Sequence, residues 1–297
     1  MKRSLVSVGV WLGVLVAGCS HASGGETGPV GASVTANAAS HAERPTMDGT
    51  CSVTEGESVQ TFTYVRGRLT ESTATELDFH TTYTYEGSRL AGIERVIRGT
   101  LAFRKELQYG ASGRLDALIT LTPQLDPTTL EESERRSFDY DAAGRALRMT
   151  NATPSGDTTQ VCVVEYDEHE RLASYTCEVP GLDEEPDRST YHYDAAGRLS
   201  EVRSAFAIFR VHYDLSGFQE HVDALSETGE VRATEALIRD DAGRAVERRA
   251  TTLLGRVLVA TIAFEGAFGP GAECGAPPPP PPGIPEHGQS IWFDISP

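Results

Sequence analysis

The sequence is organised around residues 191–199, which read Tyr191-His192-Tyr193-Asp194-Ala195-Ala196-Gly197-Arg198-Leu199. The six residues from Tyr193 to Arg198 recur unchanged at residues 140–145, and degraded copies extend from about residue 60 to about residue 265. Successive copies are separated by 20 to 31 residues, measured from one motif tyrosine position to the next. A repeat of this length is enough for two strands and two turns, and it indicates an array of one supersecondary unit.

Each copy predicts a β-hairpin. Aromatic and polar residues alternate before the aspartate, a period of two that is typical of a half-buried strand. The following Asp-x-x-Gly places Asp at the first position of a type I turn and Gly at the fourth, where a positive φ closes the hairpin. Beyond the turn, apolar residues such as Leu199 and Val202 are three apart, which predicts a bulge or a late strand start. We therefore predict an all-β fold, a curled antiparallel sheet of about eight tandem hairpins.

The motif residues are predicted to be structural, because an active site is one set of residues at one place, whereas this motif is repeated along the sheet. Three interpretations of the arginine remain open: it stacks over a neighbouring tyrosine, it pairs with the turn aspartate, or it is a solvated charge at the hairpin tip. The residues given this structural role are Tyr64, Tyr85, Tyr109, Gly113, Arg114, Tyr140, Asp141, Gly144, Arg145, Tyr166, Asp167, Tyr193, Asp194, Gly197, Arg198, Tyr213, Asp214, Gly217, Gly243 and Arg244.

Several copies depart from the pattern. The first two are one residue shorter, and two-residue turns with Gly at positive φ are expected there. Glu170 replaces the turn glycine of the fifth copy, Phe218 replaces the arginine of the seventh, and Arg239 replaces the tyrosine of the eighth. These three substitutions predict distorted units.

The first residues carry an export signal. Lys2 and Arg3 precede an apolar run from Leu5 to Val16, which is too short for a spanning helix. The segment Val16-Ala17-Gly18-Cys19 resembles a bacterial lipobox, which implies a signal peptide at residues 1–18 and lipidation of Cys19 by diacylglycerol and a further acyl chain. Two or three acyl chains hold a protein on a membrane durably. Ser20 follows, so the resemblance implies sorting to the outer membrane, on its periplasmic or cell-surface face.

The remaining chain divides into three parts. Residues 19–48 are rich in Gly, Ala, Ser and Thr, which predicts a flexible tether. Residues 49–275 form the predicted repeat domain. Residues 276–297 contain the run Pro277–Pro282, interpreted as a polyproline II linker rather than a docking site, and a short apolar tail that adds a closing strand or plugs the core.

Charge and histidine usage limit the partners. The formal net charge is −17, and removal of Lys2 and Arg3 with the signal leaves 24 − 43 = −19, which argues against nucleic acid as a partner. His192 and His212 occupy the slot before the motif tyrosine, and a solvated sheet face is favoured there over a metal site. The acidic loop Pro180–Asp187 lacks the ordered spacing of a calcium loop. We predict no cofactor and no metal.

Four cysteines remain beyond the lipobox, an even number that suggests disulfides in an exported protein. Cys162 and Cys177 flank the turn of the fifth copy symmetrically, so a hairpin in register with that turn brings them opposite each other. Cys51 and Cys274 bracket the array, and their bond would join its first and last regions. The alternative is that either pair stays as free thiols.

The motif YDAAGRL, with an aromatic residue two before the tyrosine and an apolar residue three after the leucine, resembles the YD repeats of Rhs proteins. The resemblance covers about Thr61 to Glu265. In that family tandem hairpins wind into a curled sheet that closes around a toxic cargo in large members. This chain has far fewer repeats than we expect a closed shell to need, and it lacks the family's Asp-Pro-x-Gly core motif after the array. The resemblance therefore implies the scaffold and not a caged toxin.

The sequence contains no Gly-x-Ser-x-Gly, His-Glu-x-x-His, phosphate-loop or Cys-x-x-Cys motif. We predict a non-enzymatic, lipid-anchored structural or binding module at the bacterial surface, with carbohydrate or an envelope protein as its ligand. One alternative is a glycan-processing or other hydrolase with a site on the concave face of the sheet. A second is a partner or immunity protein of a larger Rhs-type toxin.

Overall fold

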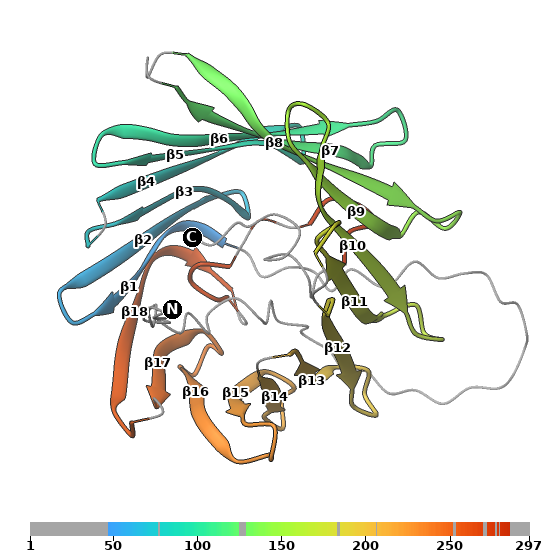
Figure 1. Ribbon diagram of the computed structural model, residues 1–297. Coiled ribbons are helices and arrows are strands. Elements are labelled where there is room, and N and C mark those ends of the chain that lie inside the picture. The colour runs from blue at the N-terminus through green and yellow to red at the C-terminus, as the bar shows by residue number, and fades with distance from the viewer. Residues whose placement is uncertain are drawn as a thin grey trace, which may run out of the picture.

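The computed structural model describes residues 47–285 apart from 77, 125–128, 183–184, 206, 252–253, 270–271, 277 and 279. These residues form eighteen β-strands (Figure 1). No helix among them is long and apolar enough to cross a membrane. The strands are β1 (Met47–Glu55), β2 (Ser58–Val65), β3 (Arg68–Ala74), β4 (Phe79–Glu86), β5 (Arg89–Ile97), β6 (Thr100–Tyr109), β7 (Leu115–Pro123), β8 (Leu130–Tyr140), β9 (Ala146–Ala152), β10 (Thr158–Tyr166), β11 (Leu172–Glu178), β12 (Asp187–Tyr193), β13 (Leu199–Arg203), β14 (Ile208–Tyr213), β15 (Gln219–Leu225), β16 (Val231–Arg239), β17 (Ala245–Thr251) and β18 (Val257–Phe268).

Each strand pairs in antiparallel fashion with the next along the chain, and β18 pairs with β1. The sheet is thus a closed 18-stranded antiparallel β-barrel. The predicted open, curled sheet of about eight hairpins is wrong, and so is the expectation that the chain has too few repeats to close. Closure arises because one further hairpin is divided between the two ends of the array. Phe264 of β18 occupies the motif tyrosine position, and it lies opposite Cys51 of β1.

The motif turns have the predicted geometry. In the copy at residues 191–199, the N–H of Gly197 donates to the carbonyl of Asp194 at 2.9 Å, and the N–H of Asp194 donates to the carbonyl of Arg198 at 2.8 Å. Gly197 has a φ of 81°. The first copy closes with a two-residue turn between β2 and β3, as predicted, and both of its residues, Arg66 and Gly67, have positive φ.

A one-residue bulge follows every one of the eight motif turns. In one example, Tyr193 pairs with Leu199 while the preceding His192 pairs with Glu201, so Ser200 is the extra residue. The register shifts at the corresponding position in the other seven motif hairpins. This bulge turns Leu199 and Val202 to the same buried face, which explains their spacing of three and confirms the predicted irregularity.

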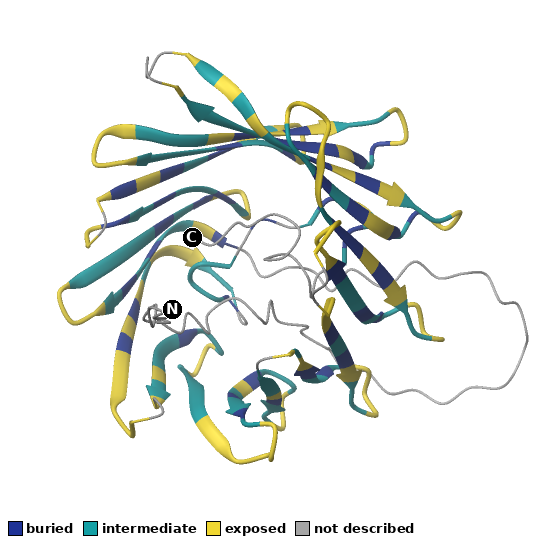
Figure 2. Cartoon of the chain, in the orientation of Figure 1, coloured by how far each residue is buried: buried dark blue, intermediate teal, exposed yellow. Residues whose placement is uncertain are grey.

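The inner face of the barrel is apolar and the outer face is polar. Apolar side chains from β1–β13, β17 and β18 form one buried cluster, which includes Phe62, Leu115, Met149 and Leu199. Buried and exposed positions alternate along most strands (Figure 2). Because each strand buries only one face, the hydrophobic alternation in the sequence determines which side of the sheet becomes the interior.

The described part of residues 272–285 packs against the interior and is called here the C-terminal strap. One part of it contacts the strands near the ends of the array, where Cys274 is bonded to Cys51 and the hydroxyl of Tyr64 donates to the carbonyl of Ala276. Further along, the carbonyl of Gly283 accepts the N–H of Ala146 at 2.9 Å. The strap therefore joins β1 and β2 to β9, which lie in different parts of the ring (Figure 1).

Candidate functional site

The arginine of the motif makes two contacts at once. Arg198 Nε donates to Asp194 Oδ2 at 2.8 Å, within its own turn. The same guanidinium lies over the ring of Tyr213 in the next hairpin, 4.3 Å from the ring centroid. The Arg198 side chain is only 24% exposed. Pairing and stacking, the first two interpretations, therefore occur together, and the solvated charge is excluded for this arginine.

This contact is repeated from hairpin to hairpin. Seven arginines lie over the aromatic ring at the motif position of the following unit. The pairs are Arg68 with Tyr85, Arg89 with Tyr109, Arg114 with Tyr140, Arg145 with Tyr166, Arg171 with Tyr193, Arg198 with Tyr213, and Arg244 with Phe264. We call this set of pairs the Arg–Tyr ladder. It runs along the motif turns at one end of the barrel.

The tyrosine hydroxyls of the ladder are also hydrogen-bonded. Each donates to the main-chain carbonyl of the residue that follows the arginine beneath it, as Tyr213 does to Leu199 at 2.8 Å. The same bond is made by Tyr85, Tyr109, Tyr140, Tyr166 and Tyr193. Burial raises the pKa of both Tyr109 and Tyr166 to about 12 although an arginine lies beside each ring. The hydroxyls are thus held as neutral donors.

The turn aspartates are held as carboxylates. Hydrogen bonds from the backbone and guanidinium of Arg145 lower the pKa of Asp141. For Asp194, partial burial acts in the opposite direction, but the bonds from Arg198 outweigh it and the net shift of the pKa is downward. The Tyr, Asp and Arg side chains of the motif are therefore bound to one another and to the backbone. This arrangement fits a structural role.

One rung of the ladder is inverted. Phe218 occupies the arginine position of the seventh copy and Arg239 occupies the tyrosine position of the eighth. Their side chains still stack, with the Arg239 guanidinium 4.9 Å from the Phe218 ring centroid. The cation and the ring have exchanged places, so the two units are not broken by the substitutions. Phe218 and Arg239 occupy the two positions that stack on each other in the other copies. A ring at the arginine position followed by an arginine at the next tyrosine position was therefore a signal in the sequence that could have predicted this exchange.

Arg239 also anchors the C-terminal strap. Its Nη2 donates to Glu273 Oε1 at 2.7 Å, and both side chains are largely buried. Burial raises the pKa of the Glu273 carboxyl, while the arginine acts against this shift. Burial likewise raises the pKa of Glu235 on β16, and its like charge with Glu273 adds to the effect. These buried carboxyls were not predicted from the sequence, because β16 and the strap have no motif that links them.

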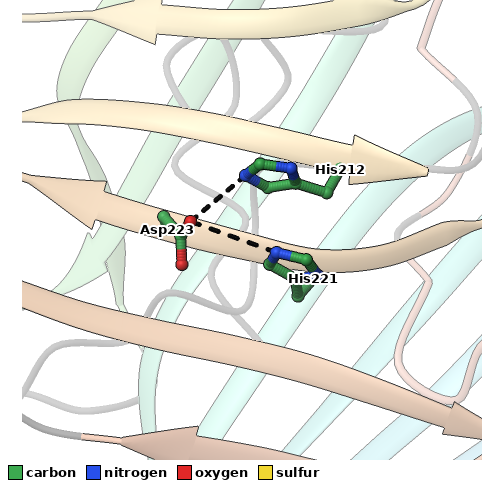
Figure 3. A group of neighbouring side chains, drawn as sticks. All are labelled: His212, His221 and Asp223. Atoms are coloured by element: carbon green, nitrogen blue, oxygen red, sulfur yellow. Dashed lines mark hydrogen bonds and ion pairs between the residues drawn. The ribbon is translucent and has the colours of Figure 1, made fainter. Parts of the chain in front are cut away.

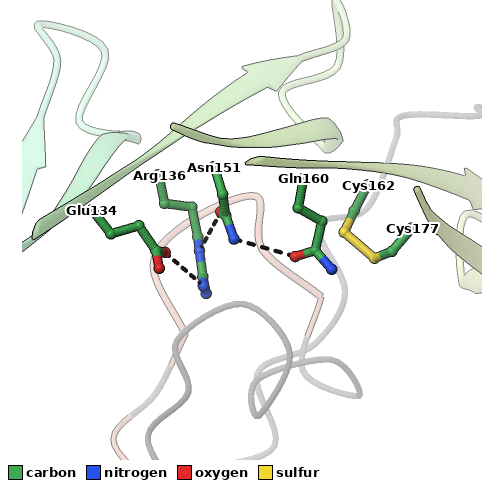
Figure 4. Close-up of a disulfide and its surroundings, with 6 residues drawn as sticks. All are labelled: Glu134, Arg136, Asn151, Gln160, Cys162 and Cys177. Atoms are coloured by element: carbon green, nitrogen blue, oxygen red, sulfur yellow. Dashed lines mark hydrogen bonds and ion pairs between the residues drawn. A yellow bond between two sulfur atoms is a disulfide. The ribbon is translucent and has the colours of Figure 1, made fainter. Parts of the chain in front are cut away.

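A second group of polar interior side chains lies beside the disulfide of β10 and β11 (Figure 4). Arg136 Nε donates to Asn151 Oδ1 at 2.8 Å, and the amide of Asn151 donates to Gln160 at 3.2 Å. Arg136 also forms an ion pair with Glu134 at 3.1 Å. The chain of contacts crosses three neighbouring strands, and it provides partners for polar groups on a largely apolar face.

The structure brings together both predicted cysteine pairs. Cys162 and Cys177 are bonded across β10 and β11, at directly opposite positions with a Cα–Cα distance of 4.0 Å. Cys51 and Cys274 are bonded across 223 residues of sequence, with a Cα–Cα distance of 5.7 Å. Cys19, the predicted lipidation site, lies outside the described residues.

Two histidines and an aspartate form a cluster on the outer face of β14 and β15 (Figure 3). His212 lies directly opposite His221, and their rings are stacked with centroids 4.1 Å apart. Asp223, two residues beyond His221 on the same face, has its Oδ2 3.1 Å from His212 Nε2 and 4.0 Å from His221 Nε2. The predicted solvated face at His212 thus holds a compact group of ligand-type atoms. His192, the other histidine of this slot, faces Glu201 instead.

Elsewhere the outer face carries ion pairs between neighbouring strands. Arg104 on β6 pairs with Glu94 on β5 at 2.6 Å, and Arg210 on β14 pairs with Glu201 on β13 at 3.0 Å. A lipid-facing strand surface has to be apolar, because a charged side chain at the bilayer centre costs about 2–4 kcal/mol. The charged outer face and the apolar inner face have the opposite polarity to a membrane-spanning barrel.

Comparison with known proteins gives only distant structural similarity. No family model matches the sequence, and no curated protein matches it. Similar structures include a chain of TcdB2-TccC3-Cdc42, at 14% identity and a TM-score of 0.37 over 67% of this chain. A porin-like protein from Bacteroides uniformis is 13% identical with a TM-score of 0.41, and the match covers 74% of this chain and 99% of that chain. The first match spans only 12% of the TcdB2-TccC3-Cdc42 chain.

Proposed function

We propose that this chain is a non-enzymatic lipoprotein of the bacterial outer membrane whose barrel serves as a scaffold or binding module at the cell surface. The observation that carries the proposal is the division between the two faces of the sheet. The inner face is filled by apolar side chains and the C-terminal strap, and the outer face is charged. A polar outer surface suits contact with a hydrophilic ligand, such as carbohydrate or an envelope protein.

The motif chemistry supports a scaffold rather than a catalyst. Each tyrosine hydroxyl of the ladder is bonded to a carbonyl, and where a turn contains both the aspartate and the arginine, the two side chains are bonded to each other. The motif also resembles the YD repeat of Rhs proteins, and that resemblance implies a scaffold of tandem hairpins. Fold and repeat alone do not define an activity, so the ligand has to be identified by binding.

Membrane attachment is assigned to the N-terminus. The lipobox-like segment ending at Cys19 supplies the anchor, and the charged outer face of the barrel argues against insertion of the strands themselves. The part of the predicted tether that precedes β1, residues 19–46, would hold the barrel away from the lipid surface. In this arrangement the outer face of the sheet is accessible to partners in the envelope.

Fractionation of cells that express the full chain tests the anchor. The wild-type protein should be found in the outer-membrane fraction, be released by detergent, and carry acyl groups detectable by mass spectrometry. The Cys19→Ser variant should lose both the acyl groups and the membrane association, while Cys162→Ser serves as a control that leaves the anchor intact. Membrane association of Cys19→Ser that resists high salt and alkaline washing would contradict the proposal, since it would require insertion of the barrel.

Binding is tested with the same full chain on a glycan array and in pull-downs with purified envelope polymers. The proposal expects saturable capture of at least one envelope polymer or protein without chemical change to it. Turnover of any tested glycan that disappears in a Glu235→Gln variant would contradict a non-enzymatic role. Glu235 is the variant of choice because it is an interior carboxyl with a raised pKa and is not part of a motif turn.

A further inference from the structure

The strand register brings three metal-ligand side chains together on the outer face of the barrel. The bulge after the seventh motif turn places His221 directly opposite His212, and Asp223 follows on the same face of β15. The ligand atoms of the three side chains all lie within 4.8 Å of one another. They form the only such group of three or more His, Cys, Asp and Glu side chains within the residues that the structure describes.

We propose that His212, His221 and Asp223 bind a divalent transition-metal ion of the Zn²⁺ class. Two imidazole nitrogens and one carboxylate oxygen are a ligand set typical of such ions, and three protein ligands leave at least one coordination position for water or an external ligand. Tetrahedral bonds of about 2.0–2.1 Å require neighbouring ligand atoms a little over 3 Å apart. The distance from His212 Nε2 to Asp223 Oδ2 is 3.1 Å, which fits this requirement. His221 Nε2 lies 4.0 Å from the same oxygen, and its ring is stacked on that of His212 with 12° between the ring planes. Because a ring nitrogen binds a metal in the plane of its ring, the His221 ring has to turn out of this stack when the ion binds.

Neighbouring side chains orient the carboxylate for this role. Thr234 on β16 donates its hydroxyl to Asp223 Oδ1 at 2.7 Å, which leaves Oδ2 directed at the two histidines. Second-shell hydrogen bonds of this kind fix ligand geometry in metal sites. Arg210 lies opposite Asp223 in the register, but its guanidinium is bonded to Glu201 on the other side. The carboxylate charge is therefore available to a cation.

The site is accessible from solvent. The side chains of His212 and His221 are 37% and 31% exposed, whereas that of Asp223 is 17% exposed. This arrangement places an open coordination position on the outer surface. The ion can therefore coordinate a donor group of a second molecule, which goes beyond the proposed scaffold function and does not depend on the lipid anchor.

Titration of the metal-free full chain with Zn²⁺, monitored by calorimetry and by competition with a chromophoric chelator, tests the proposal. The wild type should bind one more ion per chain than His212→Gln, His221→Gln or Asp223→Asn. Thr234→Val should retain the ion with about 10-fold weaker affinity, because it removes only the second-shell bond. His192→Gln is the matched control, since it removes a histidine from the same repeat slot without affecting the cluster, and it should bind as the wild type does.

Co²⁺ provides an independent spectroscopic measurement. The wild type and His192→Gln should show visible d–d absorption bands of nitrogen and oxygen coordination, and His212→Gln should not. Thermal unfolding without metal verifies that the half-exposed substitutions leave the barrel folded. Zn²⁺ stoichiometry that is equal in the wild type and in His212→Gln, or an absence of Zn²⁺ binding by the wild type, would overturn the proposal. Neither result affects the tests of lipid anchoring or of envelope binding.

Discussion

At the scale of single residues, the repeat is stabilised by contacts between the motif side chains and by their hydrogen bonds to the backbone. The aspartate accepts backbone N–H groups of the turn and the guanidinium that follows, and the arginine then covers the next tyrosine ring. The tyrosine hydroxyl caps a carbonyl at the bulge of the preceding unit. The turn and its side-chain types could be predicted from the sequence, but the choice between pairing and stacking could not, because the stacked ring belongs to the next hairpin.

Replacement of Glu170 by glycine should stabilise the barrel. Glu170 holds the turn position of the fifth copy with a φ of 63°, a conformation that costs a residue with a side chain about 1 kcal/mol. Gly197→Ala provides the matched opposite change, because its φ is 81° and the nearest atom to an added Cβ is 3.6 Å away. Denaturant unfolding should show a gain of about 1 kcal/mol for the first variant and a similar loss for the second. Glu170 Oε1 also lies 3.5 Å from Arg145 Nη1, and destabilisation by Glu170→Gly would show that this ion pair contributes more than the backbone strain costs.

The turn aspartates should make the barrel sensitive to acid. The folded-state pKa of Asp194 is lowered, so its contribution to stability is present above its unfolded pKa of about 3.9 and is lost as the pH falls through the folded value. Asp194→Asn should therefore lower the melting temperature at pH 7, and its difference from the wild type should shrink towards pH 3. A constant difference at every pH would contradict this linkage.

Glu235 should show the opposite dependence. Its folded-state pKa is raised, mainly by burial, so the stability it contributes is complete below the unfolded pKa of about 4.3 and is lost as the pH rises. Glu235→Gln should raise the melting temperature at pH 7 and change it little near pH 4. Calorimetric scans at the two pH values measure both effects, and the Asp194→Asn variant is the internal comparison of opposite sign.

At the scale of strands and hairpins, the motif determines the local register but not the final pairing. The spacing of Leu199 and Val202 predicted the bulge of the sixth copy, and the corresponding bulge of the seventh copy aligns His212 with His221. That alignment follows from the position of the motif tyrosine, so the histidine pair could have been derived from the sequence by counting back from the turn. The approach of the Asp223 carboxylate to both histidines could not be derived in this way, because it depends on the twist of the strands and on the distance between them.

The inverted rung gives a prediction at this scale. Phe218→Arg, which restores the consensus residue, should destabilise the barrel, because it places a second guanidinium beside Arg239 in a partly buried position. Phe218→Tyr retains the ring and should be close to neutral. We expect the first variant to lose about 1–3 kcal/mol of unfolding free energy. A gain in stability on Phe218→Arg would mean that the exchange of cation and ring is incidental.

At the scale of the whole molecule, closure depends on the two strands that carry the weakest repeat signal. β1 precedes the first motif, and β18 has Phe264 where the consensus has tyrosine. The repeat pattern therefore did not indicate that these two strands pair with each other. The bracketing cysteines were the one available indication. Closure depends on the angle between each hairpin and the next, summed around the sheet. The sequence pattern of a single repeat does not determine this sum. The polar outer face follows from the alternation of apolar and polar residues along the strands, and it was predictable from the sequence.

The two disulfides should differ in their effect on stability. The bond between Cys51 and Cys274 closes 223 residues, whereas that between Cys162 and Cys177 closes 15. Chain-entropy arguments assign about 5 kcal/mol to the long loop and about 3 kcal/mol to the short one. Unfolding of Cys51→Ser/Cys274→Ser and of Cys162→Ser/Cys177→Ser, compared under the same conditions, should show the larger loss in the first. A larger loss in the second would contradict this dependence on loop length.

The closure of the sheet can be measured directly by cross-linking β1 to β18. Ser52 and Ala263 lie opposite each other at this junction, on the outer face. In the Ser52→Cys/Ala263→Cys variant, mild oxidation followed by peptide mass spectrometry should identify a disulfide between these two positions within one chain. If instead the two new thiols stay reduced, or link only between chains, while the protein remains folded, the sheet is open and the account of a closed barrel is wrong.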